Sequence, residues 1–236
     1  MKTYIVPDVH ERLATLQRIV KAIPTDAEIA FLGDFFDSFN LKVAAEMAQW
    51  VKDNVQNPRY TFIIGNHDAH YFFPNDKFKC SGFTPYKDAV INSILEQEDK
   101  RQFLISVERD GWTLSHAGFR PETADWLHPE NQEFALDAAF TGNFHPLWAA
   151  GRARSGNEPF GGPTWLDWFH EFKPVRGLKQ IVGHTDHNTV RRSKQAPDNW
   201  CIDTGLRHVG ILEEGNFSYM TVDELLEKEK APHQPG

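Results

Sequence analysis

Residues 3–10 read Thr3-Tyr4-Ile5-Val6-Pro7-Asp8-Val9-His10, a short apolar run that ends directly in a carboxylate and an imidazole. The same arrangement recurs twice more. Residues 28–32 lead into Gly33-Asp34-Phe35-Phe36-Asp37, and residues 60–64 lead into Gly65-Asn66-His67-Asp68. Short apolar runs of this length are typical of buried strands. The first third of the chain is therefore predicted to hold three strands, each followed by a polar cluster.

Helical segments connect these three strands. Apolar residues recur at helical spacing from Arg12 to Ile23 until Pro24 ends the pattern, and Leu41 to Val55 is a second predicted helix. Strand and helix in alternation at this spacing predict a parallel sheet with right-handed crossovers. Ligands of open α/β sheets bind at the carboxyl ends of the strands, so the three clusters are expected to converge at one edge.

The second half of the chain predicts an antiparallel or mixed sheet. Residues 103–107 and 112–115 flank Asp110-Gly111, which is a strong signal for a hairpin turn. Two more polar clusters, Ser115-His116-Ala117-Gly118 and Gly183-His184-Thr185, each follow an apolar run. Further strands are expected at 180–182, 201–203, 209–212 and 217–222, with a turn at 213–216. Together with the parallel sheet of the first third, these strands are consistent with two sheets packed face to face.

The stretch from Phe119 to Lys179 is rich in glycine, proline and tryptophan and has weak periodicity. One interpretation is a lid or substrate-shaping insertion, because long segments of this kind are usually functional. The other is a helical subdomain packed by its tryptophans. Residues 1–230 are expected to form a single domain that includes this insertion at about 119–179, and residues 231–236 a disordered tail.

Composition excludes several classes of function. The net charge of the 236 residues is −8, so no overall field attracts nucleic acid and no general nucleic-acid binding is expected. Cys80 and Cys201 form neither a disulfide framework nor a metal-type Cys-x-x-Cys pair, and two buried or partly buried thiols are expected. No secretory signal and no membrane-length apolar run is present, so the expected location is the cytoplasm. The oligomeric state stays open.

The polar clusters supply ligands for two metal ions. Asp8 and His10 leave the same side of the first strand end, and Asp34 at the middle strand end is placed to bridge two ions. Asn66 offers a neutral oxygen, and His116 and His184 complete the second set. Imidazoles with oxygens suit manganese, iron or zinc better than magnesium, with manganese preferred and nickel also compatible. Two ions about 3.5–4 Å apart can hold a bridging hydroxide and neutralise phosphoryl oxygens.

A proton donor for the leaving group stands beside these ligands. His67 follows Asn66 directly, and Asp37, three residues after Asp34, is placed to orient the His67 ring and keep it protonated. Asp68 is an alternative member of this supporting layer. The remaining histidines, His70 among them, have no partner spacing and are expected to be structural or exposed. The residues therefore predict a two-metal phosphoryl-transfer enzyme.

The five clusters resemble the calcineurin-like metallophosphoesterase superfamily, and most of all its serine/threonine-phosphatase-like and diadenosine-tetraphosphatase-like branch. The resemblance spans residues 8–184 in the family's order, and residues 201–205 resemble its late strand and turn. It implies an α/β (α+β) fold, a four-layer αββα sandwich of two mixed sheets flanked by helices. It also implies that one ion is held by Asp8, His10 and Asp34 and the other by Asp34, Asn66, His116 and His184. His67 and Asp37 match the family's proton-donor pair.

Three departures from the family pattern concern the site. Pro7 and Glu11 stand where the first motif usually has glycine, and Ser38-Phe39 stands where the phosphatase branch has Arg-Gly. A phosphate-binding arginine is therefore missing from that position. Arg152 and Arg154 are the preferred replacements over Arg120 and Arg207. Asp186 stands where the superfamily often has a second histidine and is a possible additional metal ligand.

These features predict a binuclear metal-dependent phosphatase that hydrolyses phosphate monoesters, of phosphoproteins or small metabolites, by attack of a metal-bound hydroxide. An alternative keeps the chemistry but takes dinucleoside polyphosphates, such as diadenosine tetraphosphate, or phosphodiesters. A non-catalytic scaffold with this fold is the third hypothesis. It is disfavoured because all six core ligands and His67 are present.

Overall fold

The computed structural model describes residues 2–38 and 42–230. Its first third contains the three expected parallel strands, β1 (Thr3–Val6), β2 (Glu28–Phe31) and β3 (Tyr60–Phe62). Helices α1 (Leu13–Ala22) and α2 (Val43–Asn54) connect them. Each element lies within two residues of its predicted ends. The predicted start of the second helix at residue 41, like Phe39 and the tail 231–236, lies outside the described residues.

The first sheet is mixed and has the strand order β10-β9-β1-β2-β3. Strand β9 (His208–Glu213) pairs antiparallel with β1, and β10 (Asn216–Thr221) pairs antiparallel with β9. The predicted turn between these two strands is confirmed, because Glu214 and Gly215 both have positive φ there. Helix α7 (Val222–Lys230) follows and packs beside α1. The last part of the chain thus completes the sheet that the first part begins.

The second sheet is also mixed, with the order β4-β5-β6-β8-β7. Its strands are β4 (Ser106–Arg109), β5 (Trp112–Ser115), β6 (Gln180–Val182), β7 (Arg191–Arg192) and β8 (Asn199–Cys201). The hairpin between β4 and β5 is confirmed, since φ is 49° at Asp110 and 76° at Gly111. This is the pair of left-handed residues that a two-residue hairpin loop requires.

Two predicted strands were placed wrongly. The first hairpin strand begins at Ser106 and not at residue 103, because Leu104 instead bridges Ile63 beyond the end of β3 and bonds to the backbone of Phe62 and Ile64. The strand expected at 201–203 lies at 199–201. There Asp203 leaves the sheet and accepts a hydrogen bond from the amide of Gly205 at 3.0 Å. Strand β7 was not predicted.

The remaining helices lie between β3 and β4 and within the insertion. Helices α3 (Asn66–Phe72), α4 (Pro85–Ile94) and α5 (Gln97–Lys100) and the short 3-10 turn η1 (Asp76–Phe78) occupy the first interval. The insertion holds η2 (Pro121–Leu127), α6 (Pro129–Phe140), η3 (Pro146–Trp148) and η4 (Arg152–Arg154).

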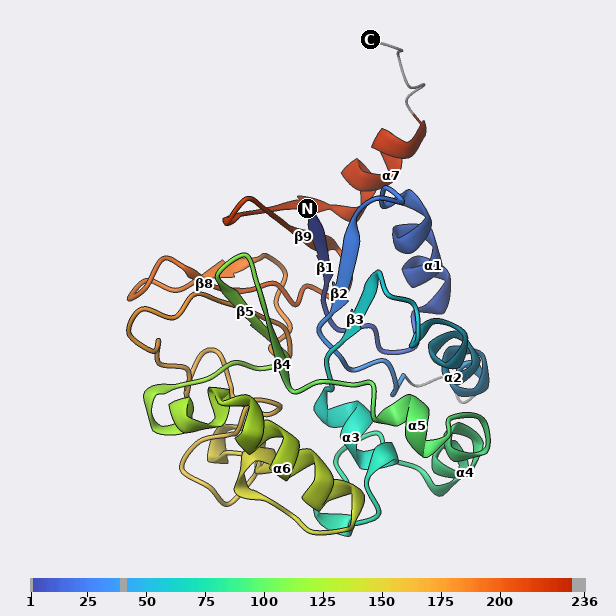
Figure 1. The fold of residues 1–236 in the computed structure, drawn as a ribbon, viewed down its shortest axis with the longest axis vertical. Coiled ribbons are helices and arrows are strands. Elements are labelled where there is room, and N and C mark those ends of the chain that lie inside the picture. Colours follow the sequence, from blue (N-terminus) through green and yellow to red (C-terminus); the bar gives the residue numbers. More distant parts are fainter. Residues whose placement is uncertain (1, 39–41, 231–236) are drawn as a thin grey trace.

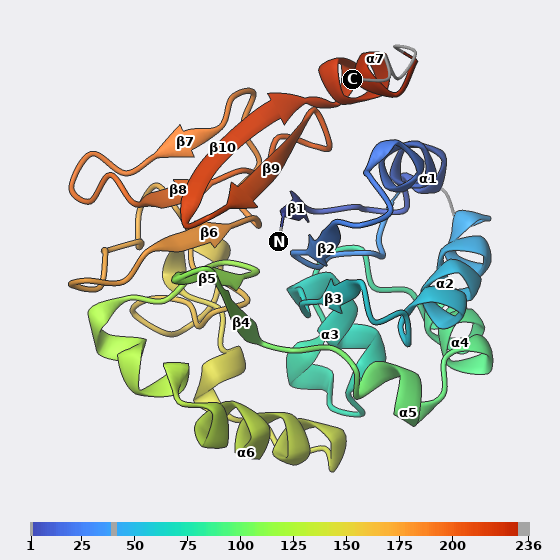
Figure 2. The same cartoon turned by 45° about the horizontal axis from the view of Figure 1, so that its top comes forward.

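The two sheets pack face to face between layers of helix and loop (Figures 1 and 2). Buried apolar side chains from both sheets fill the space between them, including Ile5 and Leu32 from the first and Leu114 and Ile181 from the second. Figure 2 shows α1 and α2 on the outer side of the first sheet. On the other face of the second sheet, Gln180 bonds to the backbone of Phe119 at the start of the insertion. The fold is therefore the expected α/β sandwich of two mixed sheets.

The insertion contributes to both the core and the surface near the polar clusters. Trp148 is 2% exposed and packs against Phe73 and Phe78. Trp165, in contrast, has its ring 5.7 Å from that of His184. One tryptophan of the insertion thus packs the core, and another lies beside a histidine of the polar clusters.

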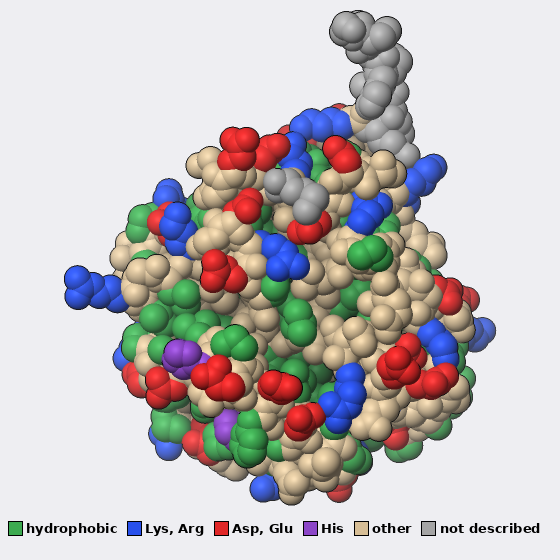
Figure 3. All heavy atoms as spheres, in the orientation of Figure 1, with side chains coloured by type: hydrophobic (Ala, Val, Ile, Leu, Met, Phe, Trp, Pro, Cys, Tyr) green, Lys and Arg blue, Asp and Glu red, His purple; other side chains and the backbone are tan. Residues whose placement is uncertain are grey.

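One cavity lies away from the polar clusters. It has a volume of about 660 Å³ and opens between α6 and β4, with apolar residues such as Phe103, Leu136 and Phe140 in its walls. Figure 3 shows hydrophobic side chains near the middle of one face of the molecule, with charged side chains around them. Among the described residues, the structure contains no helix of the length and apolarity that crossing a membrane demands. Cys80 and Cys201 are both free thiols, as predicted.

Candidate active site

The polar clusters meet at a cavity of about 470 Å³ at the carboxyl ends of the central strands. His10, Asp34 and Asn66 follow β1, β2 and β3 of the first sheet, and His116 and His184 follow β5 and β6 of the second. Most of the predicted site residues line this cavity directly, namely His10, Asp34, Asn66, His67, Arg154, His184 and Asp186. Convergence of strand ends, which the sequence predicted, therefore places the clusters side by side.

Two glycines make room for the carboxylates. A Cβ atom on Gly65 would lie 2.0 Å from Asp34 Oδ1, and one on Gly183 would lie 2.1 Å from Asp8 Oδ1. Real Cβ atoms cannot approach so closely, so only glycine is compatible with these carboxylate positions. The glycines that precede Asn66 and His184 in the sequence are thus part of the site's construction.

The backbone of the site is held in uncommon conformations. His10, Asp34 and His184 have φ values of 46°, 51° and 64°, in the left-handed region that residues other than glycine rarely adopt. Hydrogen bonds stabilise these turns, since the amides of Val9 and His10 both donate to the carbonyl of Asp34 at 3.1 and 2.7 Å. Strained backbone of this kind is concentrated at functional sites.

One group of candidate metal ligands surrounds His116. Its Nδ1 donates a hydrogen bond to the carbonyl of Leu32 at 2.8 Å, which leaves a lone pair on Nε2. This Nε2 lies 3.1 Å from Asn66 Oδ1, 3.1 Å from His184 Nδ1 and 3.4 Å from Asp34 Oδ2. Ligand atoms of Asp34, His116 and His184 all lie within 4.8 Å of one another. Electron-pair donors of four side chains therefore point at one small region.

A second group shares Asp34. The ligand atoms of Asp8, His10 and Asp34 also lie within 4.8 Å of one another. His10 Nδ1 lies 3.1 and 3.0 Å from the carbonyls of Phe36 and Asp37, so it donates there and directs Nε2 toward Asp34 Oδ2 at 3.7 Å. Asp8 is held in place by the amide of His184, which donates to its carboxylate at 3.0 Å.

The donor chemistry of these groups fits divalent cations. Oxygen and nitrogen lone pairs that face one another without an intervening hydrogen repel, and a cation between them removes the repulsion. The carboxylates of Asp8 and Asp34 are each 1% exposed, and a buried charge needs a partner. His184 Nε2 is also buried without a hydrogen-bond partner. Carboxylate, amide and imidazole together suit borderline ions such as manganese, iron and zinc.

The protonation states agree with such a site. Burial, together with the nearby charge of Arg154, lowers the pKa of His184 well below its usual value and favours the neutral, ligating form. Burial alone would raise the pKa of Asp34, but the surrounding imidazoles of His116, His67, His10 and His184 together lower it. Asp34 is thus kept ionised at the centre of both groups.

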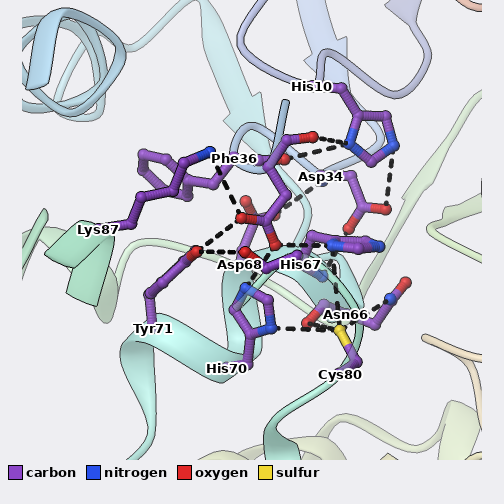
Figure 4. A network of polar contacts seen from close by, with 12 residues as sticks. His10, Asp34, Phe36, Asn66, His67, Asp68, His70, Tyr71, Cys80 and Lys87 are labelled. Carbon is purple, nitrogen blue, oxygen red and sulfur yellow. Dashed lines mark hydrogen bonds and ion pairs between the residues drawn. The ribbon is translucent and has the colours of Figure 1, made fainter. Parts of the chain in front are cut away.

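His67 and Asp37 form the predicted pair, within a larger network (Figure 4). His67 Nδ1 lies 2.8 Å from Asp37 Oδ2. Asp37 also accepts a hydrogen bond from the Tyr71 hydroxyl at 2.6 Å, and His70 Nε2 lies 2.7 Å from its Oδ2. Burial opposes protonation of His67, but the charges of Asp34 and Asp37 outweigh it and raise the pKa of His67 to about 11. The His67 ring is therefore held as an imidazolium.

Asp68, which the sequence offered as an alternative to Asp37 in supporting His67, binds backbone amides instead. Its carboxylate accepts hydrogen bonds from the amides of Asp34, Phe35 and Gly65 at 2.8 to 2.9 Å. It therefore joins the loop after β2 to the loop after β3. Burial and the charge of Asp34 raise its pKa to about 7. Asp68 organises backbone, and the His67 ring is oriented by Asp37.

Glu11, one of the departures from the family pattern, is part of a buried ion pair. Its side chain is 0% exposed and lies 2.7 Å from Nζ of Lys87, itself 1% exposed. Glu11 also accepts hydrogen bonds from the amides of Asp37 and Ser38. Lys87 Nζ lies 3.6 Å from Asp37 Oδ1. The pair thus fixes the loop that carries Asp37.

The two arginines predicted to bind phosphate, Arg152 and Arg154, occupy different positions relative to this cavity. Arg154 lines the cavity, held by Asp167 at 3.0 Å and by Thr185 Oγ1 at 2.9 Å. Arg152 is exposed and is not among the lining residues. Arg120 is buried against Glu122, and Arg207 bonds to the carbonyl of His187.

Arg12, which was not predicted as a site residue, lines the same cavity as Arg154. Its position directly after the first polar cluster was the available signal. His70 and Cys80 were missed as well, and no spacing rule connects them to His67. Asp186 is an exposed residue of the cavity wall, and its role as a ligand stays a prediction.

Known proteins share sequence features and the fold with this chain. Residues 1–188 match the model of the calcineurin-like phosphoesterase family. No curated protein matches the sequence. Solved structures with the same fold include the cold-active protein-tyrosine phosphatase of a psychrophile, Shewanella sp., which is 16% identical with a TM-score of 0.61 over 94% of this chain and 78% of that one.

Two further structures show the same fold. A putative diadenosine tetraphosphatase is 16% identical, with a TM-score of 0.53 over 93% of both chains. A protein serine/threonine phosphatase from Saccharomyces cerevisiae with similarity to human phosphatase PP5 is 13% identical, with a TM-score of 0.54 over 94% of this chain and 79% of that one. Since the family match covers most of the sequence, this chain belongs to the calcineurin-like phosphoesterases, metal-dependent hydrolases of phosphoric esters.

Proposed function

We propose that the protein hydrolyses phosphate monoesters, of a phosphoprotein or a small metabolite, at a pair of divalent ions. The observation that carries this proposal is the sharing of Asp34 between two converging groups of ligand atoms, with His67 beside them. The amide of His67 donates to Asp34 Oδ1 at 2.9 Å, which ties the proton donor to the shared carboxylate.

The two ions share one ligand, Asp34, in this proposal. Asp8, His10 and Asp34 hold one ion, and Asp34, Asn66, His116 and His184 hold the other. Manganese is the preferred metal, with iron, zinc or nickel as alternatives. The bound ions would supply Lewis acidity to the phosphoryl oxygens and would activate the attacking water.

His67 delivers a proton to the leaving oxygen. Its Nδ1 is engaged by Asp37 at 2.8 Å, so Nε2 is the nitrogen that faces the cavity with a transferable hydrogen. Asp37 in turn is fixed by Tyr71 and by the buried Lys87. This arrangement restricts the imidazole to one orientation before the substrate binds.

Two guanidinium groups bind the phosphoryl group. Arg12 and Arg154 line the same cavity as the ligand groups, and their positive charges suit the dianion of a phosphate monoester. Arg154 belongs to the insertion at 119–179, which we propose to be a substrate-shaping part of a single domain. These two arginines replace the one that the phosphatase branch carries after its second motif.

One observation favours a second substrate class. Trp165 lies in the cavity wall together with Arg154, and its indole offers a face on which a purine base could stack. A dinucleoside polyphosphate would use both residues. The similarity in fold to a putative diadenosine tetraphosphatase, which extends over 93% of both chains, is in keeping with this alternative.

The substrate class can be tested with the purified protein stripped of metal and reloaded with manganese. We expect hydrolysis of p-nitrophenyl phosphate and of a phosphopeptide well above that of the metal-free protein, and no such increase in an Asp34→Asn variant. Faster cleavage of diadenosine tetraphosphate than of the phosphopeptide would favour the alternative. Less than one tightly bound metal per chain, with no turnover of any of these substrates, would support a scaffold.

A cytoplasmic, reducing location is part of the proposal, in keeping with two free thiols.

A further inference from the structure

A third group of potential metal ligands lies next to the proposed centre and shares no ligand with it. One ligand atom from each of His67, His70 and Cys80 lies within 4.8 Å of the others. Cys80 Sγ is 3.1 Å from His70 Nδ1 and 3.9 Å from His67 Nδ1 (Figure 4). Sulfur is absent from the two groups around Asp34, so this group has a different metal preference.

The distances match a tetrahedral ion. Zinc binds thiolate at about 2.3 Å and imidazole at about 2.0–2.1 Å, and a tetrahedron with these bonds separates sulfur from nitrogen by roughly 3.6 Å. The two observed separations of 3.1 and 3.9 Å lie on either side of this value. Little movement of the side chains would therefore be needed to accommodate such an ion.

His70 is already oriented as a ligand. Its Nε2 lies 2.7 Å from Asp37 Oδ2, which leaves Nδ1 to face the thiol of Cys80. A carboxylate behind the second ring nitrogen is the usual arrangement for a histidine that binds zinc. The His70 side chain is 0% exposed, so packing restricts it to this orientation.

The group has access to solvent. Cys80 is half-buried and lines a cavity of about 350 Å³ whose walls also include Lys79 and Ser81. This cavity shares Ser81, Arg154, Ser155 and Trp165 with the cavity of the proposed active site. A hydrated ion could therefore reach the thiol without passing through the protein core.

We propose that Cys80, His70 and His67 form a separate site for one thiophilic divalent cation, such as Zn²⁺ or Cd²⁺, and that an ion there inhibits the enzyme. The inhibitory part rests on the function proposed above for His67. Binding would release the thiol proton of Cys80 and the Nδ1 proton of His67 to water, and a metal–sulfur bond and a metal–nitrogen bond would replace the S–H and N–H bonds. His67 Nδ1 could then no longer donate to Asp37, so the ring would lose the contact that orients it.

Cadmium binding tests the site without reference to activity. Manganese-loaded protein would be titrated with CdCl₂ while the ultraviolet thiolate-to-cadmium absorption is recorded. We expect a band that saturates at one cadmium per chain, is lost in Cys80→Ser and is retained in Cys201→Ser. A His70→Gln variant keeps the thiol and should bind cadmium at least 10-fold more weakly. A band that survives Cys80→Ser, or no band in the wild type, would overturn the proposal.

Zinc inhibition tests the consequence. With p-nitrophenyl phosphate as substrate and manganese in excess, the zinc concentration for half-inhibition should be at least 10-fold higher for Cys80→Ser than for the wild type. Equal values in both proteins would overturn the inhibitory part. The cadmium titration does not require turnover, so it remains decisive about the site even if the protein does not hydrolyse any of the esters tested.

Discussion

His67 is the residue on which the proposed proton transfer most directly depends. Replacing it with asparagine keeps a polar side chain but removes the transferable proton. We expect turnover of phenyl phosphate to fall roughly 10²- to 10⁴-fold, the usual contribution of a general acid, while two metals per chain remain bound. Steady-state kinetics with metal analysis of the same samples would measure both quantities.

The choice of leaving group makes this experiment specific. p-Nitrophenolate leaves readily without a proton, so the loss in His67→Asn should be smaller for p-nitrophenyl phosphate than for phenyl phosphate. His170→Asn is the matched control, because the His170 side chain is 74% exposed and does not line the cavity. An equal loss with both esters would contradict the role of His67 as the acid.

Arg12 and Arg154 are expected to act on substrate binding. Replacing either with alanine removes hydrogen bonds to a charged phosphoryl group, each worth about 1.5–3 kcal/mol, so KM should rise roughly 10-fold or more. Arg152→Ala is the control, since Arg152 is exposed and outside the lining of the cavity. Steady-state kinetics of the three variants would measure these KM values. If KM changed in Arg152→Ala but in neither of the other variants, Arg12 and Arg154 would not be the residues that bind the phosphoryl group.

At the scale of single residues, the sequence predicted those site members whose position follows directly from a strand end. Asp8, Asp34 and Asn66 are of this kind. His70 and Cys80 are not of this kind. His70 contacts Asp37 from within helix α3, and Cys80 contacts His67 from the loop after η1. The side chain of Arg12 shares the cavity with Arg154, 142 positions away, and only the packing of the two sheets makes them neighbours.

At the scale of elements, long periodic segments were predicted well and short strands less well. Helix α1 is one residue shorter at each end than the helix predicted from Arg12 to Ile23. Strand β8 has only three residues, and its register is set by pairing with β6 and not by its own apolar pattern. Ile202 is fully buried between the sheets, although it lies beyond the strand. An apolar run in the sequence therefore indicates which residues are buried, but it does not indicate which of them pair in a strand.

The Lys87–Glu11 pair joins helix α4 to the loops after β1 and β2. Replacing Lys87 with methionine would leave the buried carboxylate of Glu11 without a counter-charge. Breaking a buried pair in this way costs about 3–5 kcal/mol, so we expect a loss of this size in the free energy of unfolding. Urea denaturation of the metal-free protein would measure it.

Two further variants test whether the loss of stability in Lys87→Met comes from breaking the buried ion pair. Lys52→Met breaks a pair of similar length, 2.9 Å to Glu96, that is exposed to solvent, and it should change stability little. The double variant Glu11→Gln with Lys87→Met removes both charges and should be more stable than Lys87→Met alone. If the double variant were the less stable of the two, the pair would not be the cause of the loss.

At the scale of the whole molecule, the proposed metal centre connects the two sheets. Asp8, His10, Asp34 and Asn66 come from loops of the first sheet, and His116 and His184 follow strands of the second. The sheets also meet through the apolar layer between them. An ion bound by ligands from both sheets would add a link at their carboxyl edge, where acceptor atoms otherwise face one another. Metal binding and the stability of the sandwich should therefore be coupled.

This coupling predicts that manganese raises the unfolding temperature of the protein and that chelation lowers it. A ligand that binds only the folded state stabilises it by about 2.7 kcal/mol for each site at a free concentration 100 times its dissociation constant. Asp34→Asn, which weakens both groups of ligands at once, should lose most of the increase, whereas His170→Asn should keep it. Calorimetry of each protein with manganese and with chelator would measure the shift. If the wild type unfolded at the same temperature in both solutions, at manganese concentrations that support turnover, the ions could not be linking the two sheets as proposed.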